Sequence, residues 1–251
     1  MVSLDDYQVV SLIAKLCMHA SLVLADRLAW TRPQPPEARE RSNFEAATKR
    51  KDWAANNVMW LPSVWQALNL FAATAETYLI LCVLCPALSY HPIISAVSPV
   101  SHHSAGSSGV RLTAVYIVGW VLMCAGAALR LWCLRVMGRN FTFELSVRKG
   151  HELCTSGPYS FVRHPAYTAL YLCIIGRTMC TFGSGSWWLE YGMYTGWGKA
   201  ILVVWATITT VLGVVLIGRT GQEDQVLRNE FGSKWDEWAR ETPYLLFPYV
   251  Y

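Results

Sequence analysis

Long apolar stretches separated by short polar links run along most of this chain. A bilayer core about 30 Å thick takes roughly 20 helical residues, and five segments reach that length. They are Val9–Trp30, a stretch within Val58–Tyr90, Arg111–Met137, Phe161–Phe182 and Gly198–Gly218. The pattern therefore predicts an all-α protein, a polytopic transmembrane helical bundle of about five spans.

Two of the predicted spans carry acidic residues. The first contains Lys15, His19 and Asp26 and is the weakest of the five, so a helix lying partly in the membrane interface is its alternative. The second has Glu76 in its middle. Because a carboxylate is costly in lipid, Glu76 is expected to face the bundle, where it either pairs with another residue or contributes to a pocket.

Basic residues in the links predict the orientation in the membrane. The links after the first and third spans and the C-terminal tail contain Arg and Lys, whereas residues 91–110 and 183–197 contain neither. Basic links stay on the cytosolic side. The N-terminus is therefore predicted on the lumenal or outer side and the C-terminus in the cytosol.

Composition narrows the class of protein. Hydrophobic residues make up 53% and charged residues 15% of the chain, against about 25% charged in soluble domains. The net charge of +4 is small and dispersed, so no nucleic-acid partner is expected. Most of the cysteines lie in apolar runs, and the Cys82/Cys85 pair has no second pair, so neither a disulfide framework nor a metal site is predicted. No cleavable signal sequence is apparent, so the first span is expected to remain in the membrane.

A dense polar motif, HELCTSGPYSFVRHPAY, covers residues 151–167. Gly157-Pro158 predicts a turn, and Pro165 suits the first turn of a helix, where its missing N–H costs nothing. The first turn of a helix presents free N–H groups and a partial positive charge. This turn is therefore a candidate site for an anion such as a carboxylate.

A second motif, from Arg219 to Trp238, follows the fifth span. If it is helical, Arg219 and Glu223 lie one turn apart on the same face. Apolar residues then recur at steps of three or four, at Leu227, Phe231, Trp235 and Trp238. This spacing predicts an amphipathic helix with an aromatic stripe, and tryptophans anchored at headgroup level are an equally good interpretation.

The two motifs in this order, with a span between them and Gly138–Phe141 upstream, resemble the isoprenylcysteine carboxyl methyltransferase family. The resemblance covers roughly residues 130–248. It implies N-terminal transmembrane helices and loops over residues 1–110, and a methyltransferase-like transmembrane core with cytosolic cofactor motifs over residues 111–251.

The resemblance further implies a site for S-adenosylmethionine. The positions implied to bind the cofactor are Glu144 (where the family has glutamine), His151, Glu152, Leu153, Cys154, Tyr159, His164, Pro165, Ala166, Tyr167 and Glu223. Arg219, four residues before Glu223, is the position associated with the substrate, and Arg219 and Glu223 are the candidate catalytic residues.

These residue types suit the groups that the cofactor carries. His164 and the helix N-terminus suit its carboxylate, and Glu223 suits its ammonium or its ribose. The faces of Tyr159 and Tyr167 suit its adenine or its sulfonium cation. A carboxylate acceptor is already ionised at neutral pH and needs no base, whereas a hydroxyl acceptor would need one, with Glu144 or Asp224 as candidates.

The sequence thus predicts an integral-membrane methyltransferase, in the endoplasmic reticulum, that acts on a lipophilic acceptor among membrane lipids. The favoured acceptor is a carboxylate, either a prenylcysteine-type group or a small terpenoid-like acid. A membrane N-methyltransferase, a sterol-type reductase, and a repurposed or non-catalytic membrane protein are the alternatives. Asp224, Trp235, Trp238 and an apparent insertion over residues 183–197 depart from the family pattern and leave the acceptor open.

Overall fold

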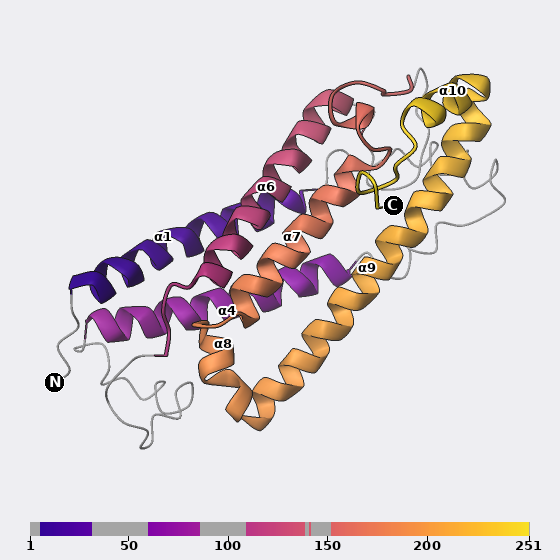
Figure 1. The fold of residues 1–251 in the computed structure, drawn as a ribbon. Helices are drawn as coiled ribbons and strands as arrows, with labels where there is room; N and C mark the ends of the chain where they lie inside the picture. Colours follow the sequence, from indigo (N-terminus) through magenta and orange to yellow (C-terminus); the bar gives the residue numbers. More distant parts are fainter. Residues whose placement is uncertain (1–5, 32–59, 86–108, 139–140, 142–151, 251) are drawn as a thin grey trace. The chain divides into compact units, whose positions relative to one another are not determined.

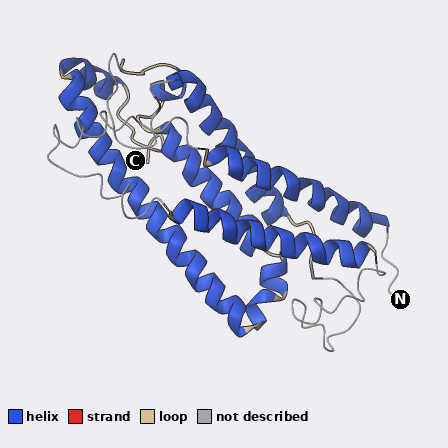
Figure 2. Ribbon diagram, turned by 180° about the vertical axis from the view of Figure 1, so that it is seen from behind, coloured by secondary structure: helices blue, strands red, loops and turns tan. Residues whose placement is uncertain are grey.

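The computed structural model describes residues 6–31, 60–85, 109–138, 141 and 152–250, and within these ranges it contains helices and no strand (Figure 2). The all-α prediction is confirmed. The helices are α1 Asp6–Ala29, α4 Leu61–Leu84, α6 Ala114–Met137, α7 Pro165–Phe182, α8 Trp187–Glu190, α9 Gly196–Phe231 and α10 Ser233–Glu241, with 3-10 turns η3 Gly157–Ser160 and η4 Gly192–Tyr194 (Figure 1).

Four helices of the described residues, α1, α4, α6 and α9, are long and apolar enough to cross a membrane. They match four of the five predicted spans. The remaining one is helical as well, as α7, but this helix begins only at Pro165 and has 18 residues including Arg177. At 36 residues, α9 is much longer than the roughly 20 residues that a bilayer needs, so it continues past the predicted span.

Local chemistry fixes where several helices begin. The Thr113 hydroxyl accepts a hydrogen bond from the backbone N–H of Tyr116 (3.3 Å) at the start of α6. The Thr195 hydroxyl accepts from the N–H of Gly198 (3.0 Å) at the start of α9. Both are the N-cap arrangement in which a side-chain oxygen satisfies a first-turn donor, and Pro165 opens α7 as its sequence position predicts.

The chain divides into two compact units. Unit 1 takes its described residues from the ranges 1–26, 64–124 and 173–208, and unit 2 from 27–63, 125–172 and 209–251.

The core of unit 1 includes the segment that the sequence suggested as an insertion. Trp187 and Trp188, in α8, are 1% and 2% exposed and pack in one hydrophobic cluster with residues of α1 and α4. Trp197 stacks on Trp187 with ring centroids 5.9 Å apart. The stretch 183–197 therefore contributes two buried tryptophans to the unit's core.

Two glycines let α6 and α7 approach closely within unit 1. A Cβ atom on Gly119 would lie 2.7 Å from the carbonyl oxygen of Gly176, and one on Gly176 would lie 2.6 Å from the backbone nitrogen of Met123. Small residues at helix crossings allow this backbone contact in membrane proteins.

The core of unit 2 gathers the aromatic stripe predicted after the fifth span. Trp235 and Trp238 are 9% and 5% exposed, in one cluster with Tyr159 and Phe141, and Leu227 and Phe231 pack against it.

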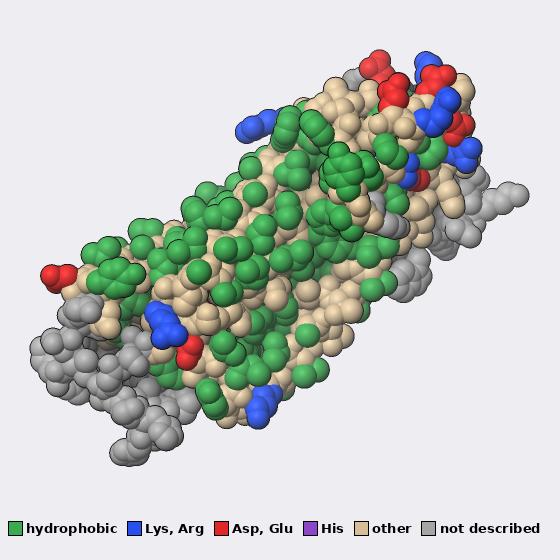
Figure 3. All heavy atoms as spheres, in the orientation of Figure 1, with side chains coloured by type: hydrophobic (Ala, Val, Ile, Leu, Met, Phe, Trp, Pro, Cys, Tyr) green, Lys and Arg blue, Asp and Glu red, His purple; other side chains and the backbone are tan. Residues whose placement is uncertain are grey.

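The prediction of one continuous helix from Arg219 to Trp238 is wrong in one respect, because the chain breaks at Gly232. The φ angle of Gly232 is +56°, a conformation that glycine adopts at little cost, and α10 starts after it. The two tryptophans face the unit's core, and their depth relative to the lipid headgroups stays a prediction. Charged side chains gather instead on the outside of α10 and the adjoining end of α9 (Figure 3).

Candidate functional site

The candidate site in unit 2 starts with the turn before α7. Gly157 has a φ angle of +60°, and a Cβ atom there would meet the Val136 side chain at 3.2 Å. Glycine fits both constraints. Gly157 begins the short 3-10 helix η3, and Pro158 is its second residue. The Gly-Pro turn predicted from the sequence is confirmed.

The C-terminal tail fixes the entry into α7. The backbone N–H groups of Arg163 and His164 donate to the carbonyls of Tyr244 and Leu245, each at 2.9 Å. The Thr168 hydroxyl donates to the carbonyl of Leu246 (2.6 Å). Two N–H groups that a candidate anion site at this turn would use are therefore already satisfied by the chain itself.

His164 joins the α7 entry to α9. Its Nδ1 lies 3.3 Å from Oε2 of Glu223, and its Nε2 lies 2.9 Å from Oδ1 of Asp224. Arg163 adds an ion pair, with Nε 3.4 Å from Oδ2 of Asp224. The sequence-predicted pair His164 and Glu223 is thus brought together, and both ring nitrogens of the histidine are engaged.

These contacts set the charge of His164. Burial by itself lowers the pKa of the imidazole, but the hydrogen bonds and charges of Asp224 and Glu223 outweigh burial and raise the pKa to about 9. An imidazolium donates from both nitrogens, which matches a carboxylate on each side. His164 is therefore a buried cation at neutral pH.

Tyr167 and Arg219 extend the network. The Tyr167 ring stacks on His164 with centroids 5.7 Å apart, and its hydroxyl lies beside Arg219 and Glu223. Arg219 is 6% exposed. By contrast, the Glu223 side chain remains 32% exposed, so part of this carboxylate is accessible beyond the contacts that orient it.

Tyr159 lies in the adjoining cluster of unit 2 together with Ala166. The indole Nε1 of Trp238 donates to the carbonyl of Tyr159 (3.2 Å), which ties α10 to the turn. Leu153 and Cys154 pack against the same cluster. The structure therefore gathers most of the described candidate residues around the start of α7.

Three candidates stand apart from this network. Glu144 and His151 lie outside the described residues, and Glu152 is exposed to solvent. No role was predicted for Arg163, and Asp224 was considered only as a base for a hydroxyl acceptor. The sequence pattern that could have predicted these contacts is two pairs of consecutive charged residues, Arg163-His164 and Glu223-Asp224. In the fold the first pair contacts the second.

The comparisons with known proteins agree with the resemblance found in the sequence. The model of the isoprenylcysteine carboxyl methyltransferase (ICMT) family matches residues 118–184, a segment that includes the turn, His164 and Tyr167. The resemblance to the ICMT family is confirmed. A protein-S-isoprenylcysteine O-methyltransferase of Xenopus laevis is similar as well, 28% identical over 87 residues, which are 29% of this chain and 30% of that protein.

A second relative is the nickel-cobalt-cadmium resistance protein NccN of Alcaligenes xylosoxydans xylosoxydans. It is 26% identical over 144 residues, 57% of this chain and 55% of that protein. The chain thus matches about half of one relative's length and under a third of the other's. Within the described ranges no three His, Cys, Asp or Glu residues are grouped so as to hold a metal ion. The ICMT matches support a membrane methyltransferase.

Proposed function

We propose that this chain is an integral-membrane methyltransferase that moves a methyl group from S-adenosylmethionine to a lipophilic acceptor, with a carboxylate as the favoured acceptor. The observation that carries the proposal is the network in which His164 is held between Glu223 and Asp224, because part of it lies in the segment that matches the ICMT family. Residues 111–251 would carry this machinery and residues 1–110 the additional membrane helices.

The described residues fit the cofactor's chemistry. Glu223 is oriented by His164 and is one-third exposed, so its remaining lone pairs suit an ammonium or ribose hydroxyls. The aromatic rings of Tyr159 and Tyr167 suit an adenine or a sulfonium cation. Because both nitrogens of His164 are engaged, we assign this residue to orienting Glu223 instead of to direct contact with the cofactor's carboxylate.

S-adenosylmethionine supplies a methyl group on a positively charged sulfur. Bound in this site, it would give that methyl group to the acceptor's carboxylate oxygen and keep the electron pair of the broken carbon–sulfur bond on its sulfur. A carboxylate is ionised at neutral pH, so this step needs alignment and a cationic anchor instead of a base. Arg219 is buried beside Tyr167 and Glu223, which suits it to hold the acceptor's anionic group.

We further propose that the site opens to the cytosol and that the protein resides in the endoplasmic reticulum. The support is the distribution of Arg and Lys between links, which follows the positive-inside rule, and the charged surface over α10 and the end of α9 (Figure 3). A glycosylation-site tag at the C-terminus tests the orientation. It should remain unglycosylated in microsomes, and modification of the tag would contradict the proposal.

The experiment that tests the activity is methyl transfer from radiolabelled S-adenosylmethionine to organic-extractable acceptors by the purified protein in lipid nanodiscs. A prenylcysteine analogue and a terpenoid acid are assayed separately, with Arg219→Gln as the variant. Transfer to either acid that Arg219→Gln reduces by about a hundredfold supports the proposal. Transfer to amines alone, or binding of a nicotinamide cofactor instead, would overturn it.

A further inference from the structure

Unit 1 buries a second group of charged side chains, which lie outside the two sequence motifs described above. Lys15 and His19 come from α1, Glu76 from α4 and Arg177 from α7, and each is at most 5% exposed. Ionisable residues inside membrane helices are rare, and they mark functional sites or internal pairs. The expectation that Glu76 pairs inside the bundle or lines a pocket is confirmed on both counts.

Each hydrogen-bond donor of the Lys15 ammonium has a partner. Its ammonium forms an ion pair with Glu76, donates to the carbonyl of Gly185 at 2.7 Å and donates to the carbonyl of Arg111 at 3.2 Å. An ammonium has three donors, and all three are used. The second carboxylate oxygen of Glu76 lies 3.7 Å from Nε2 of His19. Because Lys15 and Glu76 form an ion pair, their charges neutralise one another.

Arg177 differs from Lys15. Its Nη2 donates to the backbone carbonyl of Asn69, and no carboxylate of the described residues lies within ion-pair distance of its guanidinium. Its Nε, also buried, has no hydrogen-bond acceptor among them. A guanidinium stays protonated in proteins. The charges of Lys15 and Glu76 cancel. Arg177 therefore leaves one buried positive charge that has no ion-pair partner and no full set of hydrogen-bond acceptors among the described residues.

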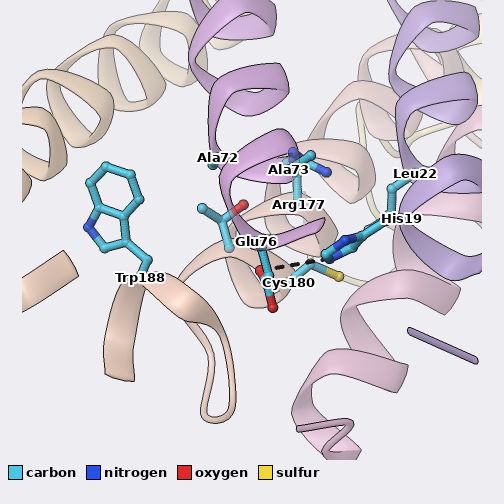
Figure 4. A pocket seen from close by; sticks show the side chains of 9 residues that line it. His19, Leu22, Ala72, Ala73, Glu76, Arg177, Cys180 and Trp188 are labelled. Atoms are coloured by element: carbon cyan, nitrogen blue, oxygen red, sulfur yellow. Dashed lines mark ion pairs between the residues drawn. The ribbon is translucent and has the colours of Figure 1, made fainter. Parts of the chain in front are cut away.

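A pocket lies beside this charge (Figure 4). Small side chains at Ala72 and Ala73 leave room for it, and its larger lining residues are Arg177, Glu76, His19, Cys180 and Trp188. The indole Nε1 of Trp188 also lacks an acceptor within the described part of the chain, but it points away from Arg177 and His19 (Figure 4). Oε1 of Glu76, which has no hydrogen-bond partner there either, is held in the ion pair with Lys15. The unsatisfied atom of Arg177 is an N–H donor, so the group that pairs with it must be an acceptor.

The size of the pocket limits that group, because there is room for about one water-sized sphere. A monatomic ion needs less of this space than the three heavy atoms of a carboxylate. A water molecule fits but leaves the charge of Arg177 uncompensated. We propose that the pocket binds one small monovalent anion of the halide class, with chloride as the physiological example, as the counter-ion of Arg177. Glu76 is tolerated beside it because Lys15 neutralises this carboxylate.

The test is the thermal stability of the detergent-purified protein at constant ionic strength, with chloride or bromide replacing gluconate stepwise. Either halide should raise the apparent Tm saturably, by about 3 °C at ten times its Kd. Arg177→Gln should lose this rise, and Arg177→Lys, which keeps the charge, should keep it with about tenfold weaker affinity. Lys199→Gln, which removes an exposed cation of the same unit, is the matched control and should keep the full rise.

Each alternative outcome has a distinct signature. Stability that is indifferent to halide in the wild-type protein would show that only water fills the pocket and would overturn the proposal. An equal rise in Arg177→Gln would assign the effect to ions elsewhere and would overturn it as well. Acetate or decanoate raising Tm as chloride does, through Arg177, would replace the halide with a carboxylate group. If Arg177→Gln does not fold, the wild-type halide series and Arg177→Lys still decide.

Discussion

The imidazole of His164 lies between two carboxylates on consecutive residues of α9, with Nδ1 3.3 Å from Glu223 and Nε2 2.9 Å from Asp224. Each carboxylate stabilises the charge on the ring, and the ring in turn orients each carboxylate. This relationship links the entry of α7, the C-terminal part of α9 and the residues proposed to bind the cofactor.

Stability should fall as the pH rises through the folded-state pKa of His164. The pKa is about 9 in the folded protein and about 6.5 in an unfolded chain. The histidine therefore contributes its full stabilisation below about pH 6.5 and loses it as the pH approaches 9, a change on the order of 3 kcal/mol. Apparent Tm measured between pH 6 and pH 10 checks this, and His164→Asn should flatten the decline. An equally steep decline in His164→Asn would assign the titration to another group.

In Asp224→Asn, His164 should lose its proton at a lower pH than it does in the wild-type protein. The substitution removes one of the two carboxylates that raise the histidine's pKa, so that pKa should drop toward 6.5. A neutral imidazole orients Glu223 less well, and affinity for S-adenosylmethionine at pH 8.5 should weaken about tenfold, as expected for a lost charge-assisted contact.

Asp236→Asn is the control for that change, because it breaks an exposed ion pair with Arg228 in the same unit. It should leave the binding and its pH dependence unchanged. Equal losses of affinity in the two variants would mean that general electrostatics, and not the His164 network, set the binding.

Trp238→Phe should loosen the turn that carries Tyr159. The substitution keeps the aromatic packing but removes the hydrogen bond from the indole to the carbonyl of Tyr159, which leaves that carbonyl buried without this donor. A loss of about 1–2 kcal/mol in the free energy of unfolding is expected. Denaturant titration measures it, and a loss well below 0.5 kcal/mol would show that the bond contributes little.

Gly119→Ala should destabilise unit 1 strongly. The new methyl group would lie 2.7 Å from a backbone oxygen of α7, and backbone cannot move aside as a flexible side chain does. Gly218→Ala has no atom within 4 Å of its added Cβ, so the usual preference of helices for alanine should make it neutral or slightly stabilising. Apparent Tm values that change equally in the two variants would contradict the close contact between Gly119 and Gly176.

Sequence patterns predicted the elements well and the partners less well. Hydrophobic length located α1, α4, α6 and α9, and Gly157 and Pro165 marked the turn and the helix start, because these signals depend on local chemistry. The break at Gly232 was missed because the three- and four-residue spacing continues across it. The pairing of His164 with Asp224, and of Lys15 with Glu76, joins residues 60 and 61 positions apart, and no local pattern specifies which side chains meet at that separation.

The central claim is that Glu223, oriented by His164, binds S-adenosylmethionine. The most direct test is calorimetric titration of the purified protein with S-adenosylmethionine, comparing wild type with Glu223→Gln and with Glu237→Gln, an exposed glutamate of α10. The account predicts saturable binding to the wild type and to Glu237→Gln, and at least tenfold weaker binding to Glu223→Gln. No binding by the folded wild-type protein, or equal affinity in all three, would contradict it.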